Sequence, residues 1–145
     1  MLSRNEIVIA APPQRVFDVL SEPGHYADWV VGAADVRDAD DEWPAVGSEL
    51  QHSQGIGPLV LKDETRVLES EPPRRLVLHA EVEPLGTMLI ALDLSGTPDG
   101  GTRVVMDEQP ASGILAAAPD ALVDRALSRR NVAALARLKE LAESG

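Results

Sequence analysis

The sequence contains no cysteine and very few aromatic residues. The absence of cysteine excludes disulfide bonds, thiolate nucleophiles and cysteine-based zinc sites, and it is compatible with a reducing cytoplasm. Aromatic side chains make up 3% of the chain, namely Phe17, Tyr26, Trp29 and Trp43. Because 44% of the residues are hydrophobic, we expect a core filled mainly by Leu, Val, Ile, Ala and Met.

The sequence also lacks long hydrophobic runs and an excess of basic charge. No apolar stretch approaches the roughly 20 residues that a membrane-spanning helix needs. The start, MLSRNEIVIA, has no basic region followed by a long apolar run, so we expect no signal peptide. The formal charge of −11 would repel nucleic acids and anionic lipids. We therefore expect a cytoplasmic protein, with no nucleic-acid partner and no membrane insertion.

Motifs for metals, nucleotides or a catalytic serine are missing as well. His25, His52 and His79 fall in three separate predicted elements and have no paired spacing. There is no GxSxG sequence, and the glycine turns GIGP and DGG do not open a helix as a phosphate-binding loop must. The sequence therefore predicts neither a metal site nor a cofactor.

The 145 residues fit one domain, 1–145, that begins with a strand and two short helices. Residues 6–11 predict a strand, and the prolines after it suit the first turn of a helix. That helix has an apolar stripe formed by Val16, Phe17 and Leu20, and it ends at Pro23 and Gly24. A second short helix follows, with Trp29 on one side.

The rest of the chain predicts a series of strands and then one long helix. The apolar spacing of Val123, Leu127, Ala134, Leu138 and Leu141 favours a helix over 119–143. Strands without helices between them pair antiparallel. The fold class is therefore α+β, with an antiparallel sheet of six or seven strands curved around the C-terminal helix. The further strands are predicted at 33–39, 48–54, 59–71, 74–83, 87–95 and 102–109.

This order of elements resembles the START-like (Bet v 1-like) superfamily, also called SRPBCC, and within it the bacterial polyketide cyclase/dehydrase-like group. The resemblance rests on IAAPPQRVFDVLSEPGHYADWV, VLESEPPRRLVLHAE, GGTRVVMDEQP and LSRRNVAALARLKELAE, and it extends over nearly the whole chain. It implies a helix-grip fold. It does not fix the function, because the superfamily includes lipid and hormone binders, cyclases, ring-hydroxylase subunits and chaperone-associated domains.

A sheet that grips a helix tends to leave a cavity between them, and the alternation of side chains along each strand predicts what lines it. His52 shares a face with Leu50, so it is either a hydrogen-bonded core histidine or a catalytic group. Asp63 and Thr65 share a face with apolar neighbours. A buried carboxylate needs a partner, and the alternative is a change of register that places Asp63 in solvent.

Further lining residues are predicted on the later strands and on the helix. Glu108 continues an inner stripe towards a strand end, where it is either an acid or base at the cavity mouth or simply solvated. The helical spacing calls for an apolar residue at 130 or 131, but Arg130 and Asn131 are both polar, so we expect one of them to face the sheet. Asn131 is the candidate ligand anchor, and Arg130 can extend its charged end to solvent. Asn131 can orient a ligand carbonyl or hydroxyl, or it can bond a backbone group or water. The remaining predicted lining residues are Trp29, Met88, Ile90, Met106, Leu127 and Ala134.

Three functions remain open at this point. The first is binding of a small hydrophobic, lipid- or polyketide-like molecule by a monomer or homodimer. The second is an enzyme that resembles polyketide cyclases or dehydratases, with His52, Asp63 and Glu108 as catalytic candidates and Asn131 as a polar anchor. The third is a protein-interaction module like the chaperone-associated members, for which the outward-facing Leu89 and Ala91 offer an apolar surface.

Overall fold

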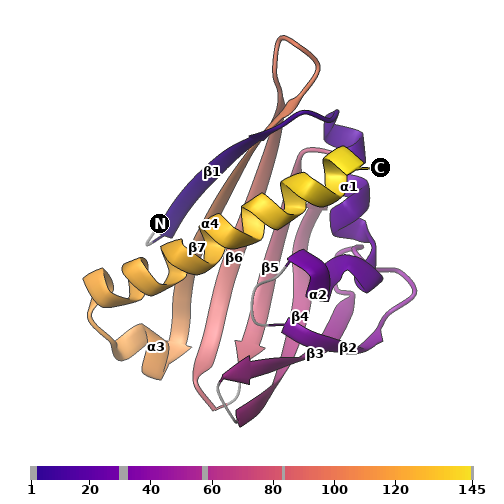
Figure 1. The fold of residues 1–145 in the computed structure, drawn as a ribbon. Helices are drawn as coiled ribbons and strands as arrows, with labels where there is room; N and C mark the ends of the chain where they lie inside the picture. The colour runs from indigo at the N-terminus through magenta and orange to yellow at the C-terminus, as the bar shows by residue number, and fades with distance from the viewer. Residues whose placement is uncertain (1–2, 30–32, 57–58, 83, 145) are drawn as a thin grey trace.

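The computed structural model describes residues 3–29, 33–56, 59–82 and 84–144. The described strands form one antiparallel sheet in the order β1-β7-β6-β5-β4-β3-β2, and a long helix lies across one face of it (Figure 1). This is the helix-grip fold that the sequence predicts. The strands are β1 Ser3–Ile9, β2 Ala33–Ala39, β3 Glu49–Ile56, β4 Leu59–Glu71, β5 Arg75–Val82, β6 Gly86–Gly96 and β7 Thr102–Gly113.

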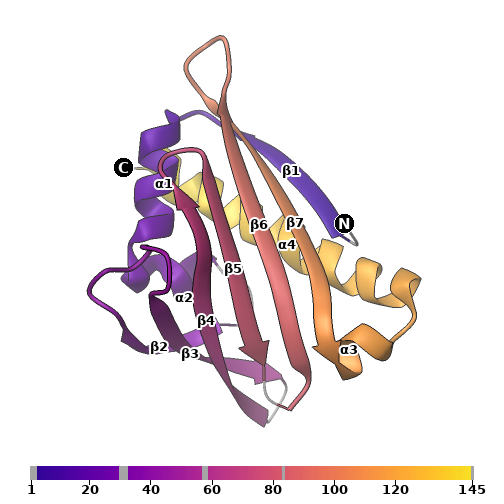
Figure 2. The same cartoon turned by 180° about the vertical axis from the view of Figure 1, so that it is seen from behind.

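The helices lie on the inner face of the sheet and at one end of it. Helix α4 (Asp120–Ser144) crosses the sheet, while α1 (Pro13–Ser21), the 3-10 turn η1 (Pro23–His25) and α2 (Tyr26–Trp29) lie beside its C-terminal half (Figure 1). A short helix α3 (Ile114–Ala117) leads into α4. Seen from behind, the outer face of the sheet has no helix over it (Figure 2). All of the helices therefore help to enclose the same, inner face.

The core lies between α4 and the inner face. Along β5, Leu76, Leu78, Ala80 and Val82 are buried, and the residues between them are more exposed. This alternation places every second side chain of the strand against the helix. From α1 and α4, the buried core receives Val16, Phe17, Val19, Leu20, Val123, Leu127, Ala134, Leu135, Leu138 and Ala142.

Most boundaries fall within two residues of the prediction, and two differ by three residues or more for physical reasons. Strand β1 begins at Ser3, not at residue 6, because pairing with β7 continues to the Ser3–Glu108 pair. Strand β7 continues to Gly113, beyond the predicted end at 109, although Pro110 lies within it. The register between β6 and β7 shifts at Met88, which pairs with Pro110. Such a bulge is a place where a strand tolerates proline.

Helix α3 is not predicted by the sequence. It has only four residues, too few for an apolar period to be recognised.

Candidate functional site

The inner face holds a buried polar pair, Glu108 of β7 and Asn131 of α4. Asn131 Nδ2 donates a hydrogen bond to Glu108 Oε1 at 3.0 Å. The exposed fractions of the two residues are 2% and 1%. Glu108 faces inward because it follows Val104 and Met106 at a spacing of two along β7. The prediction that Glu108 sits at a strand end is wrong, since β7 continues beyond it for five residues.

The protonation of Glu108 is set by its burial. Loss of hydration raises the pKa of the Glu108 carboxyl above its ordinary value, while the positive charge of Arg130 and the hydrogen bond from Asn131 act in the opposite direction without cancelling the effect. Burial disfavours the charged form of an acid. The carboxyl is therefore poised to hold its proton at higher pH than an exposed glutamate, and a protonated carboxyl can donate a hydrogen bond.

Polar groups that the sequence analysis missed lie near this pair. Ser3 pairs with Glu108 across the β1–β7 register and is fully buried. Its Oγ lies 3.1 Å from Oγ of Ser128, which in turn donates to Asp124 Oδ1 at 3.1 Å. Asp124, Ser128 and Asn131 follow one another at spacings of four and three, which is one stripe of a helix. That spacing was the signal that could have found them.

A second buried polar position lies on β4. The exposed fractions of Asp63 and Thr65 are 2% and 0%, so the alternative that places Asp63 in solvent is wrong. Strands β5 and β6 separate β4 from β7. Three strand spacings of about 4.8 Å put β4 roughly 14 Å from β7. Val67 is the residue of β4 in register with Glu108. Thr65 and Asp63 lie two and four residues further along the strand and are therefore more distant still. The structure therefore brings Glu108 and Asn131 together and places Asp63 and Thr65 at a separate position on the same face.

The face between these two polar positions is apolar. The registers align Val67, Leu78 and Ile90 in one row with Glu108. The next row aligns Thr65 with Ala80 and Met88. The other predicted lining residues, Trp29, Met106, Leu127 and Ala134, are also buried. A molecule lying along this face would meet an apolar strip with oxygen-bearing side chains at both ends.

His52 can be placed only by its backbone. It lies in β3, where it pairs with Asp63 of β4 and Val36 of β2. Its side chain lies outside the part of the chain that the structure describes, so its predicted role stays a prediction. Among the described residues, no group of three or more His, Asp or Glu side chains is arranged to hold a metal ion.

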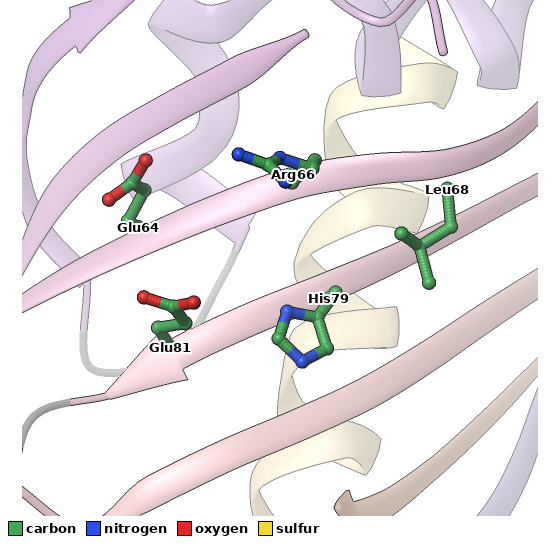
Figure 3. Close-up of a pocket in the computed structure, with 5 residues that line it drawn as sticks. All are labelled: Glu64, Arg66, Leu68, His79 and Glu81. Atoms are coloured by element: carbon green, nitrogen blue, oxygen red, sulfur yellow. The ribbon is translucent and has the colours of Figure 1, made fainter. Parts of the chain in front are cut away.

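The outer face of the sheet has a shallow pocket of a different character. It has a volume of about 260 Å³ and is lined by Glu64, Arg66, Leu68, His79 and Glu81 of β4 and β5 (Figure 3). Helix α4 lies behind the sheet in this view. Leu68 is the one aliphatic side chain among the five lining residues, so this pocket offers a hydrophobic molecule few apolar contacts.

Electrostatic contacts tie this outer pocket together. Arg66 Nε donates to Oε1 of Glu49 at 3.0 Å. The hydrogen bond that Glu64 shares with Glu49 raises the pKa of Glu64, and the same bond lowers the pKa of Glu49. Arg66, Glu49 and Glu64 therefore interact mainly with one another.

The outward residues Leu89 and Ala91, considered above as an apolar contact surface, are not freely exposed. Ala91 is 6% exposed although no helix covers its face, and Leu89 is only partly exposed. Across the strand registers, Ala91 lies between Val77 and Asp107, and Asp107 is itself only 8% exposed. This part of the sheet therefore presents little apolar area to a partner.

A family model described as "Polyketide cyclase / dehydrase and lipid transport" matches residues 3–143. The chain belongs to this family. Membership confirms the resemblance to the START-like superfamily that the sequence motifs indicated. No curated protein matches the chain. Among the described helices of this family member, none is long and apolar enough to cross a membrane.

Solved structures show the same fold at low sequence identity. Protein CV1439 from Chromobacterium violaceum is 21% identical, with a TM-score of 0.71 over 97% of this chain and 96% of that one. A protein from Rhizobium leguminosarum is 19% identical, with a TM-score of 0.74 over 98% and 93% of the two chains. DynU16, from the dynemicin biosynthetic locus, is 18% identical with a TM-score of 0.71, and the match covers 99% of this chain but 47% of DynU16.

Proposed function

We propose that this family member binds a small hydrophobic, lipid- or polyketide-like molecule between the inner face of the sheet and α4. The observation that carries the proposal is the buried hydrogen bond between Glu108 and Asn131 on a face that is mostly apolar. Ligand sites of this class combine apolar walls with a few placed polar groups. The polar pair would orient an oxygen of the ligand, and Asp63 with Thr65 would meet a second one.

The apolar walls fit the proposed ligand class. Met88, Ile90 and Met106 come from the sheet, and Leu127 and Ala134 face them from α4. Methionine side chains are flexible and adapt to ligands of irregular shape. A molecule with an apolar body and oxygens at both ends matches the distribution of polar groups on this face. The family description, which includes lipid transport, supports the same class.

Native mass spectrometry of the protein purified from its own host tests this proposal, followed by titration with the hydrophobic fluorophore N-phenyl-1-naphthylamine. Ala134→Met places a larger side chain on the inner face, and Ala136→Met makes the same change on the exposed face of α4. We expect one apolar small molecule to co-purify with each protein molecule. We also expect the fluorophore to bind about tenfold more weakly to Ala134→Met than to wild type, and Ala136→Met to bind it as wild type does. An empty protein that fails to bind the fluorophore would contradict the proposal.

A second candidate function is acid catalysis on a polyketide-like substrate. The observation that favours it is the raised pKa of Glu108, caused by burial. A protonated carboxyl can donate its proton to a substrate carbonyl or hydroxyl oxygen in a cyclisation or dehydration. Glu108→Gln keeps the size and a hydrogen-bond donor but has no acidic proton. If the protein is an enzyme, wild type converts the bound molecule to a product, and Glu108→Gln still binds this molecule but does not convert it. If the protein is a carrier, wild type releases the bound molecule chemically unchanged.

The oligomeric state and the cellular location remain predictions. Light scattering of the purified protein would distinguish a monomer from a homodimer, and fractionation of the host cells would test the cytoplasmic location. Neither outcome changes the proposal for the inner face.

A further inference from the structure

The outward face of α4 carries a concentration of positive charge that the rest of this acidic chain lacks. Residues 125–139 contain five of the 13 basic residues and no Asp or Glu. All 24 acidic residues and the other eight basic ones lie elsewhere in the chain. The exposed arginines of this segment are Arg125, Arg129 and Arg137.

These arginines are free to meet a partner. No described carboxylate lies within ion-pair distance of Arg125, Arg129 or Arg137. Elsewhere in the described chain, Arg66, Arg75 and Arg103 form ion pairs. Arg4 and Arg74 form none, but they lie in separate segments, whereas Arg125, Arg129 and Arg137 lie on one helix. In a chain with nearly twice as many acidic as basic residues, cations without a carboxylate neighbour are a notable feature. Arginine binds carboxylates through two parallel hydrogen bonds, so an unpaired arginine is well suited to recognise them.

Apolar side chains lie among the arginines. Leu122 and Val132 are 62% and 58% exposed, and Ala136 is exposed beside them. Positions 122, 125, 129, 132 and 136 are spaced by three, four, three and four residues, which forms one stripe of a helix. The stripe lies opposite the buried residues Leu127, Asn131 and Leu138. In Figure 1, no other described element lies over the side of α4 that faces away from the sheet. We call Leu122, Arg125, Arg129, Val132 and Ala136, together with Arg137, which is exposed beside them but off their helical spacing, the α4 outer stripe.

We propose that the α4 outer stripe is a docking surface for an acidic partner protein that presents a helix with carboxylates beside small apolar side chains. This interaction is independent of the ligand proposed for the inner face. Small residues such as Ala136 let a partner helix approach closely, and the arginines would pair with its carboxylates. Opposite charges across an interface speed association and reject partners of the wrong charge.

A second copy of this chain fits the stripe poorly. Two copies that met through it around a two-fold axis would bring their own arginines together, because the stripe has Arg125 near one end and Arg137 near the other. An anionic membrane also fits poorly. Helices that lie on membranes insert Trp, Phe and Leu, and the stripe offers only two large apolar side chains. The surplus of acidic residues elsewhere would be repelled by the lipid.

Fluorescence anisotropy with a synthetic peptide tests the proposal. The probe is an amphipathic helix of about 20 residues, long enough to be helical, with Glu and Ala on one face. The control peptide has Gln in place of each Glu. Arg125→Gln/Arg129→Gln removes two arginines from the stripe. Arg4→Gln/Arg74→Gln removes two other exposed arginines and gives the same net charge. Val132→Asp tests the apolar part, and thermal unfolding checks that each variant is folded.

We expect the Glu peptide to bind wild-type protein, and binding to weaken about tenfold in the stripe variant while the control double variant stays within about twofold. Val132→Asp should weaken binding as well. The proposal is overturned if the Glu peptide does not bind, if both double variants weaken binding equally, or if the Gln peptide binds as well as the Glu peptide. Arginine-dependent binding to phosphatidylglycerol vesicles without peptide binding would assign the stripe to a membrane instead.

Discussion

Asn131 of α4 and Glu108 of β7 are joined by a hydrogen bond of 3.0 Å, and neither side chain has more than 2% of its surface exposed. The bond fixes how far the long helix is rotated about its own axis relative to the sheet. It also places a titratable group in the interior, where its protonation affects stability.

Glu108→Gln should flatten the dependence of stability on pH. Because burial raises the pKa of Glu108 in the folded state above its ordinary value of 4.5, the folded protein keeps a proton that the unfolded chain releases. The contribution of Glu108 to stability is therefore lost as the pH rises from about 4.5 through the folded pKa. Urea unfolding at about pH 5 and pH 8 should show a smaller fall for Glu108→Gln than for wild type.

The matched control for this experiment is Glu140→Gln, which changes an exposed residue of α4. Its pH dependence should follow that of wild type. If Glu108→Gln and wild type lose stability in parallel between the two pH values, Glu108 is not the group responsible.

Asn131→Leu should destabilise the protein by about 1–3 kcal/mol, because Glu108 loses its buried donor. Replacing both partners, as in Glu108→Leu/Asn131→Leu, removes the unsatisfied carboxyl and should restore part of the loss. The free energies of unfolding of the single and double variants, measured with urea, form a double-mutant cycle. We expect a coupling of about 1 kcal/mol or more. Simple additivity of the two single changes would contradict the hydrogen bond.

Gly86→Ala should be more destabilising than Gly100→Ala. Both glycines have positive φ angles, +128° and +87°, so both substitutions force an unfavourable backbone conformation. A Cβ at Gly86 would lie 2.0 Å from the carbonyl oxygen of Ser112, whereas one at Gly100 would meet nothing within 4 Å. Thermal unfolding should place the additional loss at about 1–3 kcal/mol. If both variants lose the same free energy of unfolding, the strands move apart at Gly86 without an energetic cost, and the prediction is wrong.

Arg15→Met should loosen the C-terminal end of α4. Arg15 Nη2 and Nε donate to the carbonyl oxygens of Leu141 and Ala142 at 3.1 and 3.3 Å. A helix end has unsatisfied carbonyls, and a positive charge beside them is favourable. Methionine keeps an apolar stem of similar length but has no donor. We expect a loss of about 1 kcal/mol and faster amide hydrogen exchange in the last turn of α4. Arg74→Met, at an exposed residue, should change neither quantity.

Most of the fold could be predicted because its signals are local. The strands at 33–39 and 59–71 match β2 and β4 to the residue, since alternation and the flanking prolines or glycines are read from neighbouring positions. The long helix begins one residue after its predicted start. The end of β7 was not predictable, because Pro110 is accommodated by a bulge whose partner lies on β6.

The candidate site could be predicted in part. Alternation along β4 indicates that Asp63 and Thr65 face inward, and both are buried. The hydrogen bond between Glu108 and Asn131 depends on where α4 crosses the sheet, and no local pattern specifies that crossing. The helical spacing alone left open whether Arg130 or Asn131 faces the sheet. Burial of Asn131, at 1% exposure, decides the question.

The strand order places the first and last described strands next to each other in the sheet. Strand β1 pairs with β7, from Ile9 with Thr102 to Ser3 with Glu108, so its one partner among the described strands is made about 100 residues later. During synthesis, the first strand leaves the ribosome before its partner strand exists and stays unpaired until β7 emerges. Translation proceeds at about 5–20 residues per second. Such distant contacts give a high contact order and slow folding. The core between the sheet and α4 can form only after β7 and the helix that follows it have been translated.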